Sequence, residues 1–300
     1  MPRIPLPARF ASGPFTIRQG EEAGLGAKRM RGRDLQRPFR GVRVHTGRPL
    51  TFEERCLAYQ LRMPPSAFFC GPTAARIMGV PLPLPFEQSD LLHVAVPVGR
   101  RAPAGRGIRG HTLGVEPGDI RRWNGLRISG PETTWRQLGA MLGLADLVAA
   151  GDFLVHHRLP FTTRELLAAA VEGGPARRGL RMLRQALPLL DDRAESPQES
   201  RLRVILVIGG IRGIVANLPI TTSGGFRYRA DLAIPDRKVI VEYQSRFHDG
   251  SAEFRADMTR TSRLEADGWF VMQVNRDDLD GAPELVARLT LVLAGRRSAH

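Results

Sequence analysis

The chain has 300 residues, enough for two or three domains that each bury a core. Hydrophobic residues make up 42% of it and no apolar run approaches the roughly 20 residues of a membrane helix, so we expect a cytoplasmic globular protein with no membrane segment and no signal peptide. The 44 Lys and Arg exceed the 30 Asp and Glu, giving a net charge of +14. This sign favours a polyanionic partner.

The basic character is concentrated at the N-terminus, where residues 1–50 hold eleven Lys or Arg and three acids. There the pattern predicts a short helix from Thr16, a glycine-containing turn at 24–26, a second helix over 26–37 and an extended "FRGVRV". This order is typical of a winged helix, whose second helix enters DNA. The cations expected to face DNA are Lys28, Arg29, Arg31, Arg33 and Arg37. A disordered basic arm is the alternative.

A second domain is predicted over 51–190, beginning with a helix because Thr51 and Glu54 have capping-box spacing. Two strands ("LLHVAVPVG", "GIRGHTLGV") and three helices ("PETTWRQLGAMLG", "ADLVAAGDFLVHH", "TTRELLAAAVEGG") indicate a mixed α/β domain. No catalytic constellation is evident in it, and we assign His156 and His157 no chemistry. The polar stretch "DDRAESPQES" predicts a linker and a third domain over 191–300.

The third domain has a regular alternation of predicted elements. They are a helix "SPQESRLRVILVIGG", strands "GIVANLPI", "FRYRADLAI" and "VIVEYQ", a helix "SAEFRADMTRTSRLEADG", a strand "WFVMQVN" and a last helix from Asp277. The order α-β-β-β-α-β-α is similar to that of restriction-endonuclease-like cores. The fold class expected for the chain is therefore α/β (α+β), with that core at the C-terminus.

Two acids stand in strands of this domain, where acids are unfavourable. Asp231 and Glu242 flank the tight turn "PDRK", so antiparallel pairing would bring both carboxylates to one end of the sheet. Such a pair suits a hard cation, Mg²⁺ or Mn²⁺, beside a phosphodiester. Gln244 points the same way as Glu242 because strand side chains alternate, and its amide could orient water or contact phosphate. The alternative is that both acids are charges that protect a sheet edge.

The stretch "RADLAIPDRKVIVEYQ", with "SPQESRLR" before it and "FRADMTRTSRLEADGWFVMQV" after it, resembles the PD-(D/E)xK nucleases, and most closely very-short-patch-repair endonuclease-like proteins. The resemblance covers about 192–292. It implies metal ligation by Asp231 and Glu242. It also implies a supporting catalytic role for Glu199, Gln244 and His248 and phosphate contact by Arg255, Arg260 and Arg263.

Gln244 replaces the lysine of the broad signature, and Ser245 and Arg246 stand where relatives often have a glycine and an acid. The lysine's usual role therefore does not carry over. Each remaining residue also has a structural interpretation. Glu199 completes a capping box with Ser196, His248 braces a loop, and the arginines form a solvated helix face.

The middle segment from "LLHVAVPVG" to "DFLVH" is similar to the antitoxin-like domain of type IV abortive-infection systems. That resemblance implies DNA binding through the preceding winged helix and a protein partner for the middle domain. Our leading hypothesis is a metal-dependent DNA endonuclease. The alternatives are a DNA-binding regulator with a silent nuclease fold, and a protein-binding antitoxin.

Overall fold

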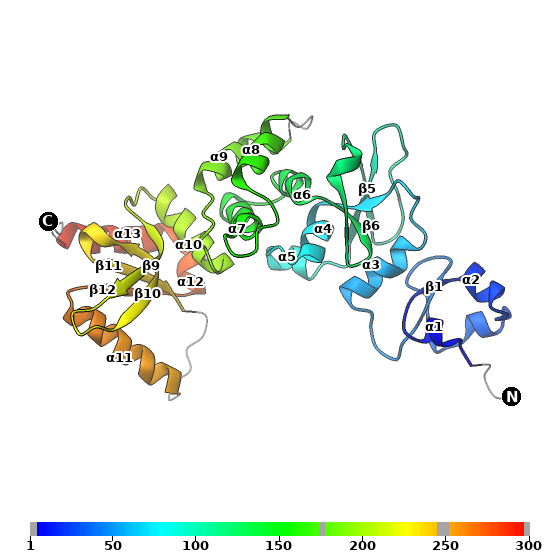
Figure 1. Cartoon of the computed structure of the whole chain (residues 1–300), viewed down its shortest axis with the longest axis horizontal. Coiled ribbons are helices and arrows are strands. Elements are labelled where there is room, and N and C mark those ends of the chain that lie inside the picture. Colours follow the sequence, from blue (N-terminus) through cyan, green and yellow to red (C-terminus); the bar gives the residue numbers. More distant parts are fainter. Residues whose placement is uncertain (1–4, 174–177, 245–251, 297–300) are drawn as a thin grey trace. The chain divides into compact units, whose positions relative to one another are not determined.

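The computed structural model describes residues 5–173, 178–244 and 252–296 (Figure 1). They divide into two compact units, Met1–Gln137 and Leu138–His300. The chain is mixed α/β, as expected. Among the described residues, no helix has the length and apolar character needed to cross a membrane.

The N-terminal unit begins with a small antiparallel sheet in the order β1-β3-β2, with β1 at Phe15–Thr16, β2 at Leu35–Gln36 and β3 at Val42–His45. Two short helices accompany it, α1 at Ala8–Ala11 and α2 at Ile17–Glu22. The expected helix after Thr16 is confirmed, because the Thr16 side chain and Gln19 form a complete capping box. The core of this sheet consists of Phe10, Phe15, Leu25, Met30 and Leu35.

The predicted recognition helix over 26–37 is wrong. In its place is one 3-10 turn, η1 (Arg29–Arg31), followed by β2. Gly32 ends the turn in an extended conformation, and a Cβ there would lie 2.5 Å from Asp34 Oδ1 and 2.7 Å from Arg29 Nη1. The Arg29–Asp34 ion pair, 2.8 Å between Nη2 and Oδ2, folds across Gly32 and leaves no room for a helical turn to continue.

The rest of this unit is a five-stranded sheet in the order β6-β5-β4-β8-β7. Its strands are β4 (Phe68–Phe69), β5 (Leu92–Pro97), β6 (Ile108–Leu113), β7 (Ile120–Trp123) and β8 (Leu126–Ser129), with η2 (Pro117–Asp119) before β7. Its helices are α3 (Phe52–Gln60), α4 (Gly71–Met78), α5 (Leu84–Glu87) and α6 (Pro131–Leu138). The predicted strands β5 and β6 and the capping box of Thr51 and Glu54 are confirmed.

The C-terminal unit opens with the helices α7 (Leu144–Val155), α8 (Arg164–Gly173) and α9 (Leu180–Ala186), and with η3 (Leu187–Leu189). Helix α10 (Pro197–Ile208) packs against α7. Buried Asp152 of α7 accepts hydrogen bonds from Ser200 Oγ and Arg203 Nη2 of α10, both at 2.7 Å. The helices on the two sides of the predicted boundary at 191 are therefore joined by a buried ion pair.

The remaining elements form a four-stranded sheet in the order β12-β11-β10-β9. They are β9 (Val215–Thr221), β10 (Arg227–Ile234), η4 (Pro235–Arg237), β11 (Val239–Tyr243), α11 (Ala252–Ala266), β12 (Phe270–Val274), α12 (Arg276–Asp280) and α13 (Ala282–Gly295). The first three strands are an antiparallel meander, and β12 is parallel to β11 after the crossover helix α11. The predicted order is confirmed, except that the last helix is broken in two at Gly281.

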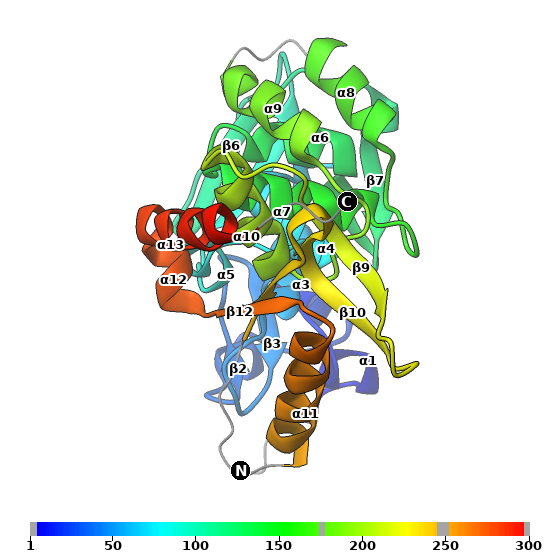
Figure 2. The ribbon, with the colours of Figure 1, turned by 90° about the vertical axis from the view of Figure 1, so that its left-hand side faces the viewer.

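Helices cover both faces of this sheet (Figure 2). On one face Ile240 of β11 packs with Leu264 of α11. On the other face Val239 and Val241 pack with side chains of α10 and α13. Alternation along β11 therefore turns Glu242 toward α11 and Tyr243 toward α10 and α13.

Candidate functional site

Glu242 lies on the face of the sheet that α11 covers, and Asp231 lies near it on the neighbouring strand. The pairing of β10 with β11 ends at Leu232 and Val241, and continuing its antiparallel register by one residue brings Asp231 beside Glu242. Asp231 Oδ2 accepts a hydrogen bond of 3.1 Å from the backbone N–H of Tyr243. The two predicted ligands are thus neighbours on adjacent strands, at the end of β11 farthest from the "PDRK" turn.

Glu242 does not face solvent, since it is 3% exposed. Both of its carboxylate oxygens accept hydrogen bonds from Arg260 of α11, Oε2 from Nη1 at 2.6 Å and Oε1 from Nη2. Arg260 also donates to the Arg229 carbonyl at 3.1 Å and lies 3.5 Å from Asp257 Oδ1. The hydrogen bonds to Glu242 raise the pKa of Arg260, so this guanidinium is a permanent cation beside the acid pair.

Glu199 lies in the first turn of α10, where Ser196 Oγ accepts from its backbone N–H at 3.1 Å. The N-cap role of Ser196 is therefore confirmed. The Glu199 carboxylate, however, does not complete the expected capping box with Ser196. Its Oε2 accepts from the Glu195 N–H at 3.2 Å and from the Asn217 amide at 3.1 Å. Glu199 is thus held toward β9.

Asn217 is a site residue that the sequence analysis missed. It has φ = 51°, the left-handed region that asparagine tolerates better than most residues, and it interrupts β9. Ala216 and Leu218 on its two sides pack in different hydrophobic clusters. Its amide donates to Glu199 and, at 2.7 Å, to the Arg193 carbonyl. The signal available in the sequence was an asparagine inside a strand pattern, where this residue is disfavoured.

Negative charge is in excess at this end of the sheet. Burial, together with the nearby carboxylates Glu199 and Glu242, raises the pKa of Asp231 to about 6 against the lowering effects of the Tyr243 N–H and Arg260. Glu199 and Glu242 therefore both lie within electrostatic reach of Asp231. Nevertheless, in the part of the chain that the structure describes, no three acidic, His or Cys side chains converge closely enough to hold a metal ion.

Gln244 follows Glu242 at the end of β11, where its backbone N–H donates to the Val274 carbonyl at 2.8 Å. Its side-chain amide lies 3.4 Å from Asp257 Oδ2, which also accepts from Gln273 at 3.2 Å. Gln244 is therefore linked to α11 through Asp257, a residue that the sequence analysis did not single out. His248 lies outside the described residues.

The predicted phosphate-contacting arginines of α11 occupy different surroundings. Arg260 faces the acid pair, whereas the Arg263 guanidinium lies over the half-exposed Phe226 ring, 3.6 Å from its centroid. Arg255 is exposed. In the N-terminal unit Arg29 is buried against Asp34, and the other four predicted cations are exposed: Lys28, Arg31, Arg33 and Arg37. These four are therefore accessible to a polyanion, but no recognition helix presents them.

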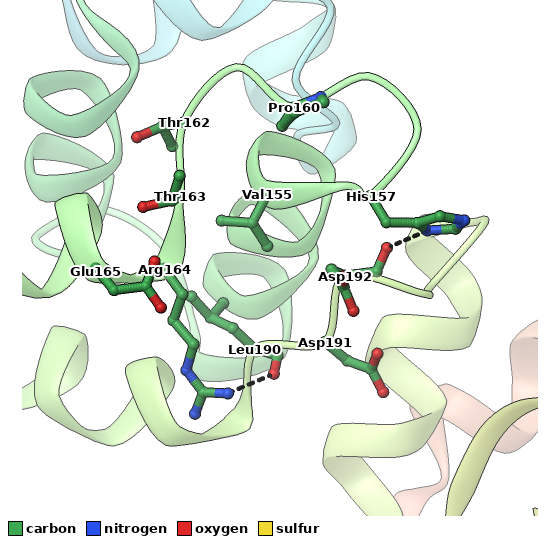
Figure 3. Close-up of a pocket in the computed structure, with 10 residues that line it drawn as sticks. All are labelled: Val155, His157, Pro160, Thr162, Thr163, Arg164, Glu165, Leu190, Asp191 and Asp192. Carbon is green, nitrogen blue, oxygen red and sulfur yellow. Dashed lines mark hydrogen bonds between the residues drawn. The ribbon is translucent and has the colours of Figure 1, made fainter.

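A separate pocket of about 550 Å³ lies where α8 begins (Figure 3). In it the His157 ring contacts the Asp192 carbonyl at 2.9 Å, and Arg164 donates to the Pro188 carbonyl at 3.1 Å. The lining residues are Val155, His157, Pro160, Thr162, Thr163, Arg164, Glu165, Leu190, Asp191 and Asp192. His157 and Arg164 are thus both engaged with backbone carbonyls.

Comparison with known proteins yields relatives with no stated activity. No family model matches the chain, and no solved structure matches it. It is similar to two proteins of Mycobacterium tuberculosis, uncharacterized protein Rv2248 of strain H37Rv and uncharacterized protein MT2308 of strain CDC 1551. Each is 31% identical over 247 residues, which are 82% of this chain and 88% of the relative. The matched length exceeds that of either compact unit, so the similarity extends over both.

Proposed function

The chain belongs to the family of uncharacterized protein Rv2248, and within that family we propose that it is a divalent-metal-dependent nuclease that hydrolyses phosphodiester bonds of DNA. The observation that carries the proposal is the proximity of Asp231 and Glu242 at the ends of adjacent strands, where Asp231 accepts from the N–H of the residue after Glu242. The sheet order β12-β11-β10-β9, with its antiparallel meander and parallel β12, supports a restriction-endonuclease-like core.

The residues at this site fit a hard cation. Carboxylate oxygens are the ligands that Mg²⁺ and Mn²⁺ prefer, and a guanidinium already stands beside Glu242 as a cation. Asp231 and Glu242 would hold the metal. Glu199, which accepts a hydrogen bond from the Asn217 amide, would add a nearby negative charge that favours cation binding. A bound metal would supply activated water and neutralise charge that develops on the phosphate oxygens. In the same proposal Gln244 and His248 orient water or phosphate.

The proposed DNA substrate rests on charge. The chain carries a net charge of +14, and exposed cations lie on the N-terminal unit and on α11. If Lys28, Arg31, Arg33 and Arg37 contact phosphates, their joint replacement by Gln will weaken DNA binding and flatten its salt dependence. With fewer phosphate contacts, binding releases fewer counterions. Equal salt slopes for the variant and the wild type would show that these four residues do not contact DNA.

The decisive test is cleavage of plasmid and linear DNA with Mg²⁺ or Mn²⁺. We expect D231A and E242A each to abolish cleavage while the protein remains folded. The matched control is D236N, which removes an exposed acid of the η4 turn and should cleave like the wild type. Unchanged cleavage by D231A and E242A would exclude this site.

The second candidate is a DNA-binding regulator whose nuclease-like domain is catalytically silent. Its support is the bidentate Arg260 pair, which occupies both oxygens of Glu242. Absence of cleavage with either metal, on every form of DNA, would favour this candidate. An antitoxin-like protein partner for the middle of the chain stays a prediction.

A further inference from the structure

Arg260 is the cation that lies against the Glu242 carboxylate, where it competes with any metal that Glu242 would ligate. Its two terminal nitrogens each bond a different oxygen of Glu242, so neither oxygen is left without a cationic partner. The pair is buried on the carboxylate side, where the side chain of Glu242 is 4% exposed, and more open on the arginine side, where the side chain of Arg260 is 20% exposed. The guanidinium can therefore leave toward solvent, but the carboxylate cannot.

An aromatic ring also lies beside the guanidinium. While paired with Glu242, its carbon lies 5.7 Å from the centroid of the Tyr228 ring, an aromatic face that attracts cations. Arg263 donates to the Tyr228 hydroxyl at 3.3 Å, whereas Arg229 is paired with Glu195. Arg260 and Arg263 are thus two cations beside Tyr228, an arrangement that fits the phosphates of a nucleic acid.

Charge decides which partner Arg260 prefers. One guanidinium faces Glu242, Asp231 and Asp257, so a divalent cation at Glu242 compensates the acids better than Arg260 alone. The freed guanidinium then remains beside the site, where a phosphate is the anion left for it to bind.

Resting on the proposed function, we propose that Arg260 is an exchangeable counter-cation. It holds Glu242 until a divalent cation displaces it, and it then binds a phosphate of the DNA substrate. Arg260 thereby couples metal binding to substrate binding, because each step favours the other. No covalent step is involved.

The first experiment measures Mn²⁺ affinity of the full chain by titration calorimetry, without DNA. We expect R260Q to bind Mn²⁺ at least about tenfold more tightly than the wild type, since the competing cation is gone. The control R263Q removes an arginine of the same helix that does not touch Glu242, and it should bind like the wild type. R260K retains the charge without the bidentate geometry, so its affinity for Mn²⁺ should lie between those of the wild type and R260Q. R260K also replaces R260Q as the test variant if R260Q does not fold.

The second experiment measures affinity for a DNA duplex in Ca²⁺ and in chelator. R260Q should lose about tenfold in affinity in Ca²⁺ and little in chelator, where the wild-type guanidinium is held by Glu242. R263Q should lose the same amount of DNA affinity in Ca²⁺ and in chelator. A loss that does not depend on the metal would overturn the exchange.

The Mn²⁺ results separate this inference from the proposed function. If D231N abolishes Mn²⁺ binding while R260Q and the wild type bind equally, the metal site stands and the exchange is refuted. If the wild type does not bind Mn²⁺ but R260Q does, the metal does not displace Arg260, so the exchange is refuted and Arg260 is a fixed partner of Glu242 that blocks the metal site. If neither protein binds Mn²⁺, both the metal site and the exchange are refuted.

Discussion

Two buried pairs of carboxylate and guanidinium lie in the C-terminal unit, and they differ in how far the arginine is exposed. In the first, Asp152 of α7 meets Arg203 of α10, with side chains 2% and 9% exposed. Asp152 also accepts from Ser200 Oγ and from the Asp191 N–H, both at 2.7 Å. Every contact is therefore made inside the protein, and the pair joins two helices.

The second pair, Glu242 with Arg260, has the same chemistry in a different setting. Its arginine is more exposed, and Asp231 and Glu199 add negative charge that one guanidinium does not cancel. An enclosed pair stabilises the packing of two elements. A pair with a more exposed arginine and further acids beside it is suited to exchanging its cation, and the following experiments test this contrast.

The largest effect is expected from breaking the enclosed pair. R203Q leaves the Asp152 charge buried without its partner, which should lower the free energy of unfolding by about 3–5 kcal/mol. R260Q should lower it less, because water and dissolved cations reach Glu242 from the open side of its pair. Urea denaturation at pH 7 measures both. Equal losses would show that the difference in exposure has no energetic consequence.

A pH dependence follows from the enclosed pair. Burial raises the pKa of Asp152 from 3.8 to about 6, so the stability that protonated Asp152 contributes is complete below pH 4 and is lost as the pH rises through 6. The free energy of unfolding of the wild type, minus that of D152N, should fall by up to about 3 kcal/mol between pH 4 and 7. A difference that is constant with pH would show that burial does not perturb Asp152.

Mn²⁺ should stabilise the protein through the acids beside Arg260 and not through the Asp152–Arg203 pair. If Mn²⁺ binds only the folded protein, it stabilises the wild type by about 2.7 kcal/mol at a hundredfold excess over its dissociation constant. D231N should lose most of this gain, yet in chelator it should melt at or above the wild-type temperature, because repulsion among the acids is relieved. Thermal denaturation with Mn²⁺ and with chelator measures both.

D152N, at the enclosed pair, is the matched control for this experiment. It should keep the full upward shift with Mn²⁺. An equal shift in D231N and the wild type would mean that Asp231 is no ligand.

The smallest effect concerns how Glu199 is held. N217G keeps the left-handed backbone and removes the amide, which should cost about 1 kcal/mol for the lost hydrogen bonds. N217A also removes the amide but keeps a Cβ at φ = 51° without the polar side chain that lets asparagine adopt this region, which should cost roughly 1–2 kcal/mol more than N217G. Chemical denaturation of both variants measures the difference. Equal costs would show that the backbone at residue 217 relaxes.

Local patterns in the sequence were sufficient for the order of elements in the C-terminal unit and for the proximity of Asp231 and Glu242. Both follow from short-range physics, since period-two alternation marks strands and a tight turn sets the register of the strands that it joins. The helix starts at Thr51 and Ser196 were equally local. The error at 26–37 came from a short-range contact that a pattern does not contain, the Arg29–Asp34 pair folded over Gly32.

What only the tertiary structure decided is the set of partners of the charged groups. Glu242 is 18 residues from Arg260, Glu199 is 18 from Asn217, and Asp152 is 51 from Arg203. No periodicity or spacing relates such residues, because their meeting depends on how α11, β9 and α7 pack after the chain has folded. The sequence alone therefore determined where the acids lie on the strands. Packing determined that one arginine closes a structural pair and another lies against a carboxylate proposed to bind a metal.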